Sequence, residues 1–145
     1  MIAEYLKDNL SLLDSVNSWE ESIAAASEVL VNKKVISELY VQAMIDNVNK
    51  NGSYIVIVPQ VALAHARPDN GVIKTGISLL KLNKPVMFPE GKSVNIVVVL
   101  AANEEKNHLE LMSELADLFI DDKKIENIIS AASVDYLQQL IEKSD

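Results

Sequence analysis

The run Val94-Asn-Ile-Val-Val-Val-Leu100 limits the fold of this chain more than any other feature. Valine and isoleucine favour strands, and a strand that is apolar at nearly every position must be covered on both faces. We therefore expect this run to be the central strand of a sheet. Other strands are expected at residues 54–58, also buried on both faces, at 61–64, at 76–82 and, as a short edge piece, at 85–88.

The two ends of the chain show helical spacing instead of strand-like runs. Asn17 or Ser18 is placed to cap a first helix that runs to about Val31, with Glu20 and Glu21 positioned for a capping box. A second helix is expected from Ser37 to about Asn51, and its buried face should hold Leu39, Tyr40, Ala43, Met44 and Val48. Residues 1–16 are amphipathic, and Leu6, Leu10 and Leu13 also have helix-like spacing.

After the strands, Asn107 is placed to cap a helix whose buried face would hold Leu109, Met112, Ala116 and Phe119. Shorter helices should follow at residues 125–131 and after Ser133. The order of helices, strands and helices predicts an α/β (α+β) fold, with a mixed β-sheet flanked by helices on both faces. With 145 residues and no linker-like tract, the sequence predicts a single domain that spans residues 1–145.

Composition excludes several classes of function. The formal net charge of −8 and the pI near 4.7 argue against nucleic acid or an anionic membrane as the main partner. The chain has no cysteine, which excludes disulfides, thiolate catalysis and cysteine-ligated zinc. No apolar run approaches the roughly 20 residues of a membrane helix, and the N-terminus does not resemble a signal peptide. We therefore expect a cytoplasmic protein with no direct membrane insertion.

His65 is the first candidate for chemistry. It ends the apolar run 61–64, and the breaker cluster 68–71 follows it, so it should lie at the end of a strand. Arg67 is the chain's only arginine and, two residues on, should project from the same face. Its rigid fork of donors matches phosphate. The alternatives are a structural role for His65 and a surface ion pair between Arg67 and Asp69.

His108 is the second candidate, and it should fall in the first turn of the helix after the central strand. Free backbone amides face outward there, and ligands collect at such helix starts. The helix dipole would lower the pKa of His108, whereas Glu104, Glu105 and Glu110 would raise it, so the sequence leaves the net shift open. The alternative is a solvated histidine at a helix start.

Two histidines and an arginine brought together suit phosphoryl transfer through a phosphohistidine, which needs no cofactor and no metal. The competing use is a metal site completed by Asp69 or a glutamate, as in a small hydrolase. The histidine spacing matches no metal motif, and the arginine would repel a cation. Dinucleotide, Walker and nucleophile-elbow motifs are also missing.

The segment Ala62-Leu-Ala-His-Ala-Arg-Pro-Asp-Asn-Gly-Val72, with Gly76-Ile-Ser-Leu-Leu-Lys-Leu82 and the later Val97-Val-Val-Leu-Ala-Ala102 and His108-Leu109, resembles a known family. It is similar to the IIA components of the bacterial phosphoenolpyruvate-dependent sugar phosphotransferase system. The mannitol/fructose type is the nearest large class, and within it the ascorbate-type branch, where Ala-Arg-Pro also follows the histidine. The resemblance covers residues 17–140.

The resemblance implies a cytoplasmic phosphocarrier in sugar uptake. His65 would accept a phosphoryl group from the phosphocarrier protein HPr and pass it to a cysteine of a IIB component, which serves a IIC transporter. His108 would match the second family histidine, which helps to bind the phosphoryl group, and Arg67 is a candidate phosphate or partner contact. A regulatory interaction module that is switched by phosphorylation of His65 is the alternative.

The chain departs from the family pattern at two positions. Ala64 stands where the family usually has proline, which predicts a looser strand end before His65. Pro59-Gln60 stands where Pro-Gly is common. The sequence does not identify the sugar, and it leaves open whether the chain forms a homo-oligomer. An apolar patch is expected from Val58 and Val61 or from Met87 and Phe88, and such a patch would serve docking or self-association.

Overall fold

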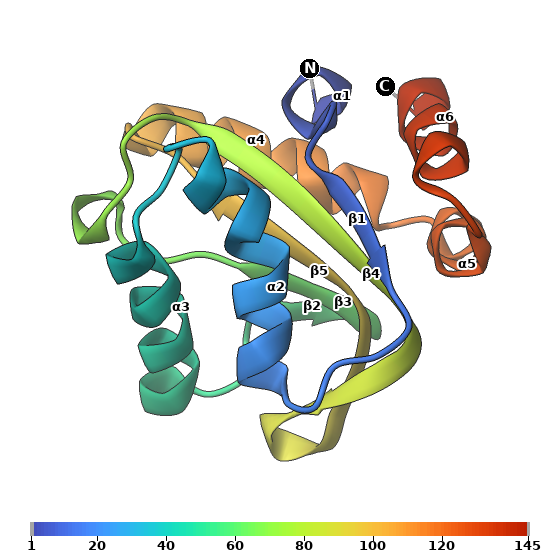
Figure 1. Cartoon of the computed structure of the whole chain (residues 1–145), viewed down its shortest axis with the longest axis horizontal. Helices are drawn as coiled ribbons and strands as arrows, with labels where there is room; N and C mark the ends of the chain where they lie inside the picture. Colours follow the sequence, from blue (N-terminus) through green and yellow to red (C-terminus); the bar gives the residue numbers. More distant parts are fainter. Residues whose placement is uncertain (1, 145) are drawn as a thin grey trace.

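The computed structural model describes residues 2–144, and these form a five-stranded mixed sheet with helices on both faces (Figure 1). The strand order is β1-β4-β5-β3-β2. The central strand β5 pairs with β4 in the antiparallel sense and with β3 in the parallel sense. The predicted architecture is therefore confirmed. The strands are β1 (Leu10–Leu13), β2 (Val56–Val58), β3 (Gln60–Ala64), β4 (Gly76–Phe88) and β5 (Lys92–Ala101).

Helices cover both faces of the sheet. Helices α2 (Trp19–Asn32) and α3 (Glu38–Asn51) pack against one face. A second layer of helices packs against the opposite face. It consists of α1 (Ile2–Leu6), α4 (Glu105–Leu118), α5 (Asp122–Ser130) and α6 (Val134–Ser144). Figure 1 shows α2 and α3 on the left of the strands, α1, α5 and α6 on the right, and α4 behind.

Successive side chains of a strand point to opposite faces of the sheet, so each packs in one of two cores, the one under α2 and α3 or the one on the α4 side. On β3, Ala62 and Ala64 face α2 and α3, whereas Val61 and Leu63 face the α4 side. The central strand follows the same rule and is buried from Val94 to Ala101. A residue that continues β3 beyond Ala64 is thereby directed toward the α4 side.

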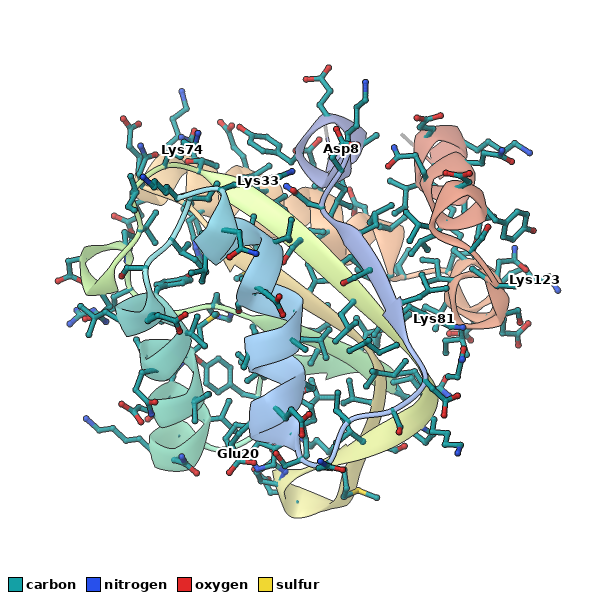
Figure 2. All side chains as sticks on the ribbon, viewed as in Figure 1. Asp8, Glu20, Lys33, Lys74, Lys81 and Lys123 are labelled. Carbon is teal, nitrogen blue, oxygen red and sulfur yellow. The ribbon has the colours of Figure 1, made fainter. Side chains whose placement is uncertain are left out.

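Lys81 is unusual because it is a charged residue of which only 3% of the surface is exposed. It lies on β4, and its ammonium group donates hydrogen bonds to Asn83 and to the carbonyl of Ala131 just after α5. Figure 2 labels Lys81 between the sheet and α5. Burial lowers the pKa of the Lys81 ammonium group. The side chain therefore ties the end of α5 to the sheet.

The N-terminal segment corrects the helical interpretation of residues 1–16. The helix ends at Leu6, and Leu10–Leu13 is an edge strand parallel to β4. Asp8 has φ 64°, a left-handed conformation that cannot continue a helix. Lys33, which directly follows α2, donates hydrogen bonds to the carbonyl of Asp8 and the side chain of Asn9, and Figure 2 labels both Lys33 and Asp8.

Two strand predictions also need correction. The segment 54–58 is not buried on both faces, because β2 lies at the sheet edge and Ile57 is 38% exposed. Residues 85–88 are not a separate piece but the second half of β4, paired with β5 beyond an irregularity. Val61 and Phe88 are buried, so the expected apolar patch is reduced to Val58 and Met87.

The buried faces of two helices match the predictions only in part: Tyr40, Met44 and Val48 of α3 and Phe119 after α4 are buried as predicted, whereas other members are not. Helix α4 begins at Glu105 rather than after Asn107, and its buried residues are Leu111, Leu115 and Leu118. Leu109 is 62% exposed, and Leu39 on α3 is 63% exposed. Apolar residues occur on both faces of α4, so helical spacing alone did not determine which face packs against the sheet. The cap of α2 is as predicted, since the Ser18 side chain accepts from the backbone N–H of Glu21.

Candidate functional site

The two histidines meet at one edge of the sheet. Strands β3 and β5 are parallel neighbours, with Ala64 opposite Val99, so their carboxyl ends lie together. His65 follows β3 directly and continues the alternation of Val61 and Leu63 toward the α4 side. His108 lies in the first turn of α4, which follows β5. Ligands collect at such strand ends in open sheets.

The two imidazole rings are in contact distance and half-buried. Their centroids lie 5.4 Å apart with an interplanar angle of 58°. Nδ1 of His65 lies 2.8 Å from the carbonyl oxygen of Leu63. Because a carbonyl can only accept, Nδ1 carries the proton, and the neutral ring then has a free lone pair on Nε2. The Nε2 lone pair of His65 is thus free to interact with a group bound beside it.

The environment favours the neutral form of His108. Burial lowers the pKa of His108, the neighbouring His65 lowers it further, and Glu105 opposes both effects. The sequence left the sign of this shift open, and the structure assigns a downward one. A neutral second ring can lie beside His65 without repelling it and can still donate a hydrogen bond.

Polar side chains of α3 and of the segment before β2 also contact His65. The edge of Tyr54 meets the His65 ring, with centroids 5.9 Å apart and an interplanar angle of 83°. The Asn47 amide donates to the Tyr54 hydroxyl at 2.7 Å and to the His65 carbonyl at 3.3 Å, and it accepts from Asn51 at 2.7 Å. The sequence analysis did not identify these three residues, because no motif or spacing links them to His65.

Arg67 lies in the same groove as the two histidines but does not contact their rings through any ion pair or hydrogen bond in the described residues. The groove is open, has a volume of about 1010 Å³ and is also lined by Lys50 of α3. Arg67 is exposed and precedes the short 3-10 helix Pro68–Asn70. Within the part of the chain that the structure describes, it makes no ion pair with Asp69. Its guanidinium is therefore available to a group bound in the groove.

Across residues 2–144, no three histidine, aspartate or glutamate side chains come together as metal ligands would. Over the same residues, no helix is both long and apolar enough to cross a membrane.

Comparison with known proteins gives the family. Residues 4–144 match the family model described as "Phosphoenolpyruvate-dependent sugar phosphotransferase system, EIIA 2". This chain is a member of that family. The resemblance of the sequence to IIA components is thereby confirmed, and such components act as phosphotransferases in the sugar phosphotransferase system.

Relatives of both expected kinds are similar to the chain over almost its whole length. The mannitol-specific cryptic phosphotransferase enzyme IIA component of Escherichia coli (strain K12) is 31% identical, covering 98% of each chain. The ascorbate-specific EIIA component of Salmonella typhimurium (strain LT2) is also 31% identical, covering 97% of each. Among solved structures, the mannitol IIA of Escherichia coli in complex with its phosphorylated IIB has a TM-score of 0.80 at 27% identity, covering 94% of this chain and 95% of that one.

Proposed function

We propose that this chain is a cytoplasmic phosphocarrier that takes a phosphoryl group from phospho-HPr on His65 and passes it to a cysteine of a IIB component. The observation that carries the proposal is the hydrogen bond from Nδ1 of His65 to Leu63, which leaves Nε2 free beside His108. The IIB partner is supported by the solved complex of a related IIA with its IIB. No cofactor or metal is required for a transfer between side chains.

Transfer of the phosphoryl group from the donor histidine to His65 requires no net movement of protons. The Nε2 lone pair attacks phosphorus while the N–P bond of the donor phosphohistidine breaks, and its electron pair returns to the donor imidazole. Positive charge then grows on the His65 ring. The hydrogen bond from Nδ1 to the Leu63 carbonyl strengthens as this charge develops, so it stabilises the transition state more than the free ring.

His108 and Arg67 would act on the oxygens of the transferred group. A neutral His108 can donate one hydrogen bond to a phosphoryl oxygen, and the phosphoryl charge itself would favour protonation of this ring. The Arg67 fork, exposed in the same groove, can reach the phosphoryl group or an acidic residue of a docked partner. In the second step the N–P bond breaks as the IIB thiolate attacks phosphorus.

The test is an intact mass after mixing the purified chain with phosphoenolpyruvate, enzyme I and HPr. We expect one acid-labile, base-stable phosphoryl group that is absent in His65→Ala. Labelling of His65→Ala under the same conditions would refute the assignment of His65. Addition of a IIB component then separates the carrier from the regulatory module, because a carrier loses its label to the IIB cysteine whereas a module retains it.

A further inference from the structure

Tyr40 on α3 places a buried hydroxyl between the two strand ends that carry the site. Its surface is 1% exposed, and its ring belongs to the core between the sheet and α2 and α3. The hydroxyl accepts a hydrogen bond of 3.0 Å from the backbone N–H of Ala66, the residue after His65. It donates one of 2.7 Å to the carbonyl of Leu100, at the end of β5. One oxygen atom therefore bridges the exits of β3 and β5.

The two hydrogen bonds of the Tyr40 hydroxyl lie just beyond the last residue pair of the β3–β5 ladder. The β3–β5 ladder ends with Ala64 opposite Val99. Beyond this pair, the chain after β3 continues through His65 to Arg67, and β5 leads through a short connection to α4 and His108. The Tyr40 hydroxyl bonds to the backbone just past the ladder on both sides, so it fixes how far the two exits separate.

We propose that Tyr40 is a positioning residue for phosphoryl transfer, whose hydroxyl holds His65 in register with His108. This inference rests on the function proposed above and extends it to a residue outside the groove. The hydroxyl does not touch the reacting atoms. It acts through Ala66, and the main-chain direction at Ala66 determines where the adjacent His65 ring points and whether Nδ1 can reach the Leu63 carbonyl.

The bridge is insensitive to pH over the range in which the protein works. Burial raises the pKa of the Tyr40 hydroxyl to about 12, although the hydrogen bond with Ala66 acts in the opposite direction. The hydroxyl therefore keeps its proton and continues to donate to Leu100 at neutral pH. Any pH dependence of the transfer should come from the histidines and not from this bridge.

The test is Tyr40→Phe, which keeps the buried ring and removes only the bridging oxygen. Ser78→Ala is the matched control, because Ser78 on β4 is also fully buried and its hydroxyl donates at 2.6 Å to a carbonyl, that of Ala26 on α2. Both variants lose one buried hydroxyl and should show similar falls in thermal midpoint. Only Tyr40→Phe alters the strand exits that carry the histidines.

Phosphoryl acceptance is measured by single-turnover rapid quench over a range of phospho-HPr concentrations. For Tyr40→Phe we expect the maximal rate constant to fall at least tenfold, with the half-saturating concentration unchanged within twofold. Ser78→Ala should keep the wild-type rate within twofold. Equal rates for Tyr40→Phe and wild type, or an equal slowing of both variants, would overturn the proposal.

A second measurement needs no phosphoryl donor. The ¹⁵N shifts of the His65 ring report its tautomer, and amide hydrogen exchange reports the Ala66 N–H. In Tyr40→Phe, Ala66 should exchange faster and the His65 shifts should move toward a mixture of tautomers, with neither change in Ser78→Ala. If the wild-type chain accepts no phosphoryl group, the proposed function fails; unchanged His65 shifts in Tyr40→Phe would overturn the positioning role by themselves.

Discussion

Replacing His108 by alanine should slow phosphoryl acceptance by His65 without abolishing it. Removal of one preorganised donor to a developing charge costs about 10²–10³ in rate when the site excludes water. His108 is half-buried in an open groove, so water can substitute in part for the lost ring. We therefore expect a slowing of about 10- to 100-fold, equivalent to roughly 1.4–2.7 kcal/mol of transition-state stabilisation.

The assay is single-turnover transfer from phospho-HPr, followed by rapid quench and intact mass. Asn107→Ala is the control, because Asn107 lies in the same turn of α4 and is equally half-buried, and it should keep the wild-type rate within twofold. His108→Gln restores an N–H donor at this position and should recover part of the rate. A rate for His108→Ala within twofold of wild type would refute the reasoning and make His108 a solvated residue at a helix start.

Three further predictions follow from the geometry. The phosphoryl group should reside on Nε2 of His65, since Nδ1 is bonded to Leu63, and ³¹P–¹⁵N correlation spectra that place it on Nδ1 would contradict this. Gln60→Gly should raise the free energy of unfolding by about 0.5–1 kcal/mol in urea titrations, because Gln60 has φ 76°, which glycine adopts without strain. The control Gln42→Gly, inside α3, should instead lower the free energy of unfolding by about 1 kcal/mol. A lower free energy of unfolding in both variants would show that no strain is relieved at residue 60. The pKa of His108 is lower in the folded state, so below about pH 6.5 the unfolded chain binds more protons than the folded chain. Stability should therefore rise with pH through that window, and His108→Ala should reduce the slope, whereas an unchanged slope would argue against the lowered pKa.

The sequence predicted the central strand of the sheet because its signal there depends on burial. An apolar run as continuous as residues 94–100 can be satisfied only between two layers, and the structure buries it there. The placement of His65 and His108 follows from this, since both lie just beyond the ends of strands or at the start of the next helix. Their contact at 5.4 Å additionally requires β3 and β5 to be parallel neighbours, which the sequence does not state.

The errors occur where local patterns fit two structures equally well. The segment 10–13 suits a helix through Leu10 and Leu13 and a short strand through Leu10 and Leu12, and the left-handed Asp8 prevents the preceding helix from continuing into it. On α4, apolar residues such as Leu109 lie on the exposed side as well, so packing against the sheet was needed to select the buried side. Asn47 and Tyr40 were missed as supports of the site because their partners are 18 and 26 residues away, respectively.

The two departures from the family pattern can now be placed relative to the histidine. Ala64 is fully buried and paired with Val99, so the ladder extends to the residue before His65 even without the usual proline. Gln60 takes the positive φ that the glycine of the family would adopt without strain. Proline would hold the strand end through its own ring, whereas this chain holds it through pairing on one side of His65 and through the Tyr40 bridge on the other. The loosening expected from the loss of proline is therefore opposed by contacts from other elements.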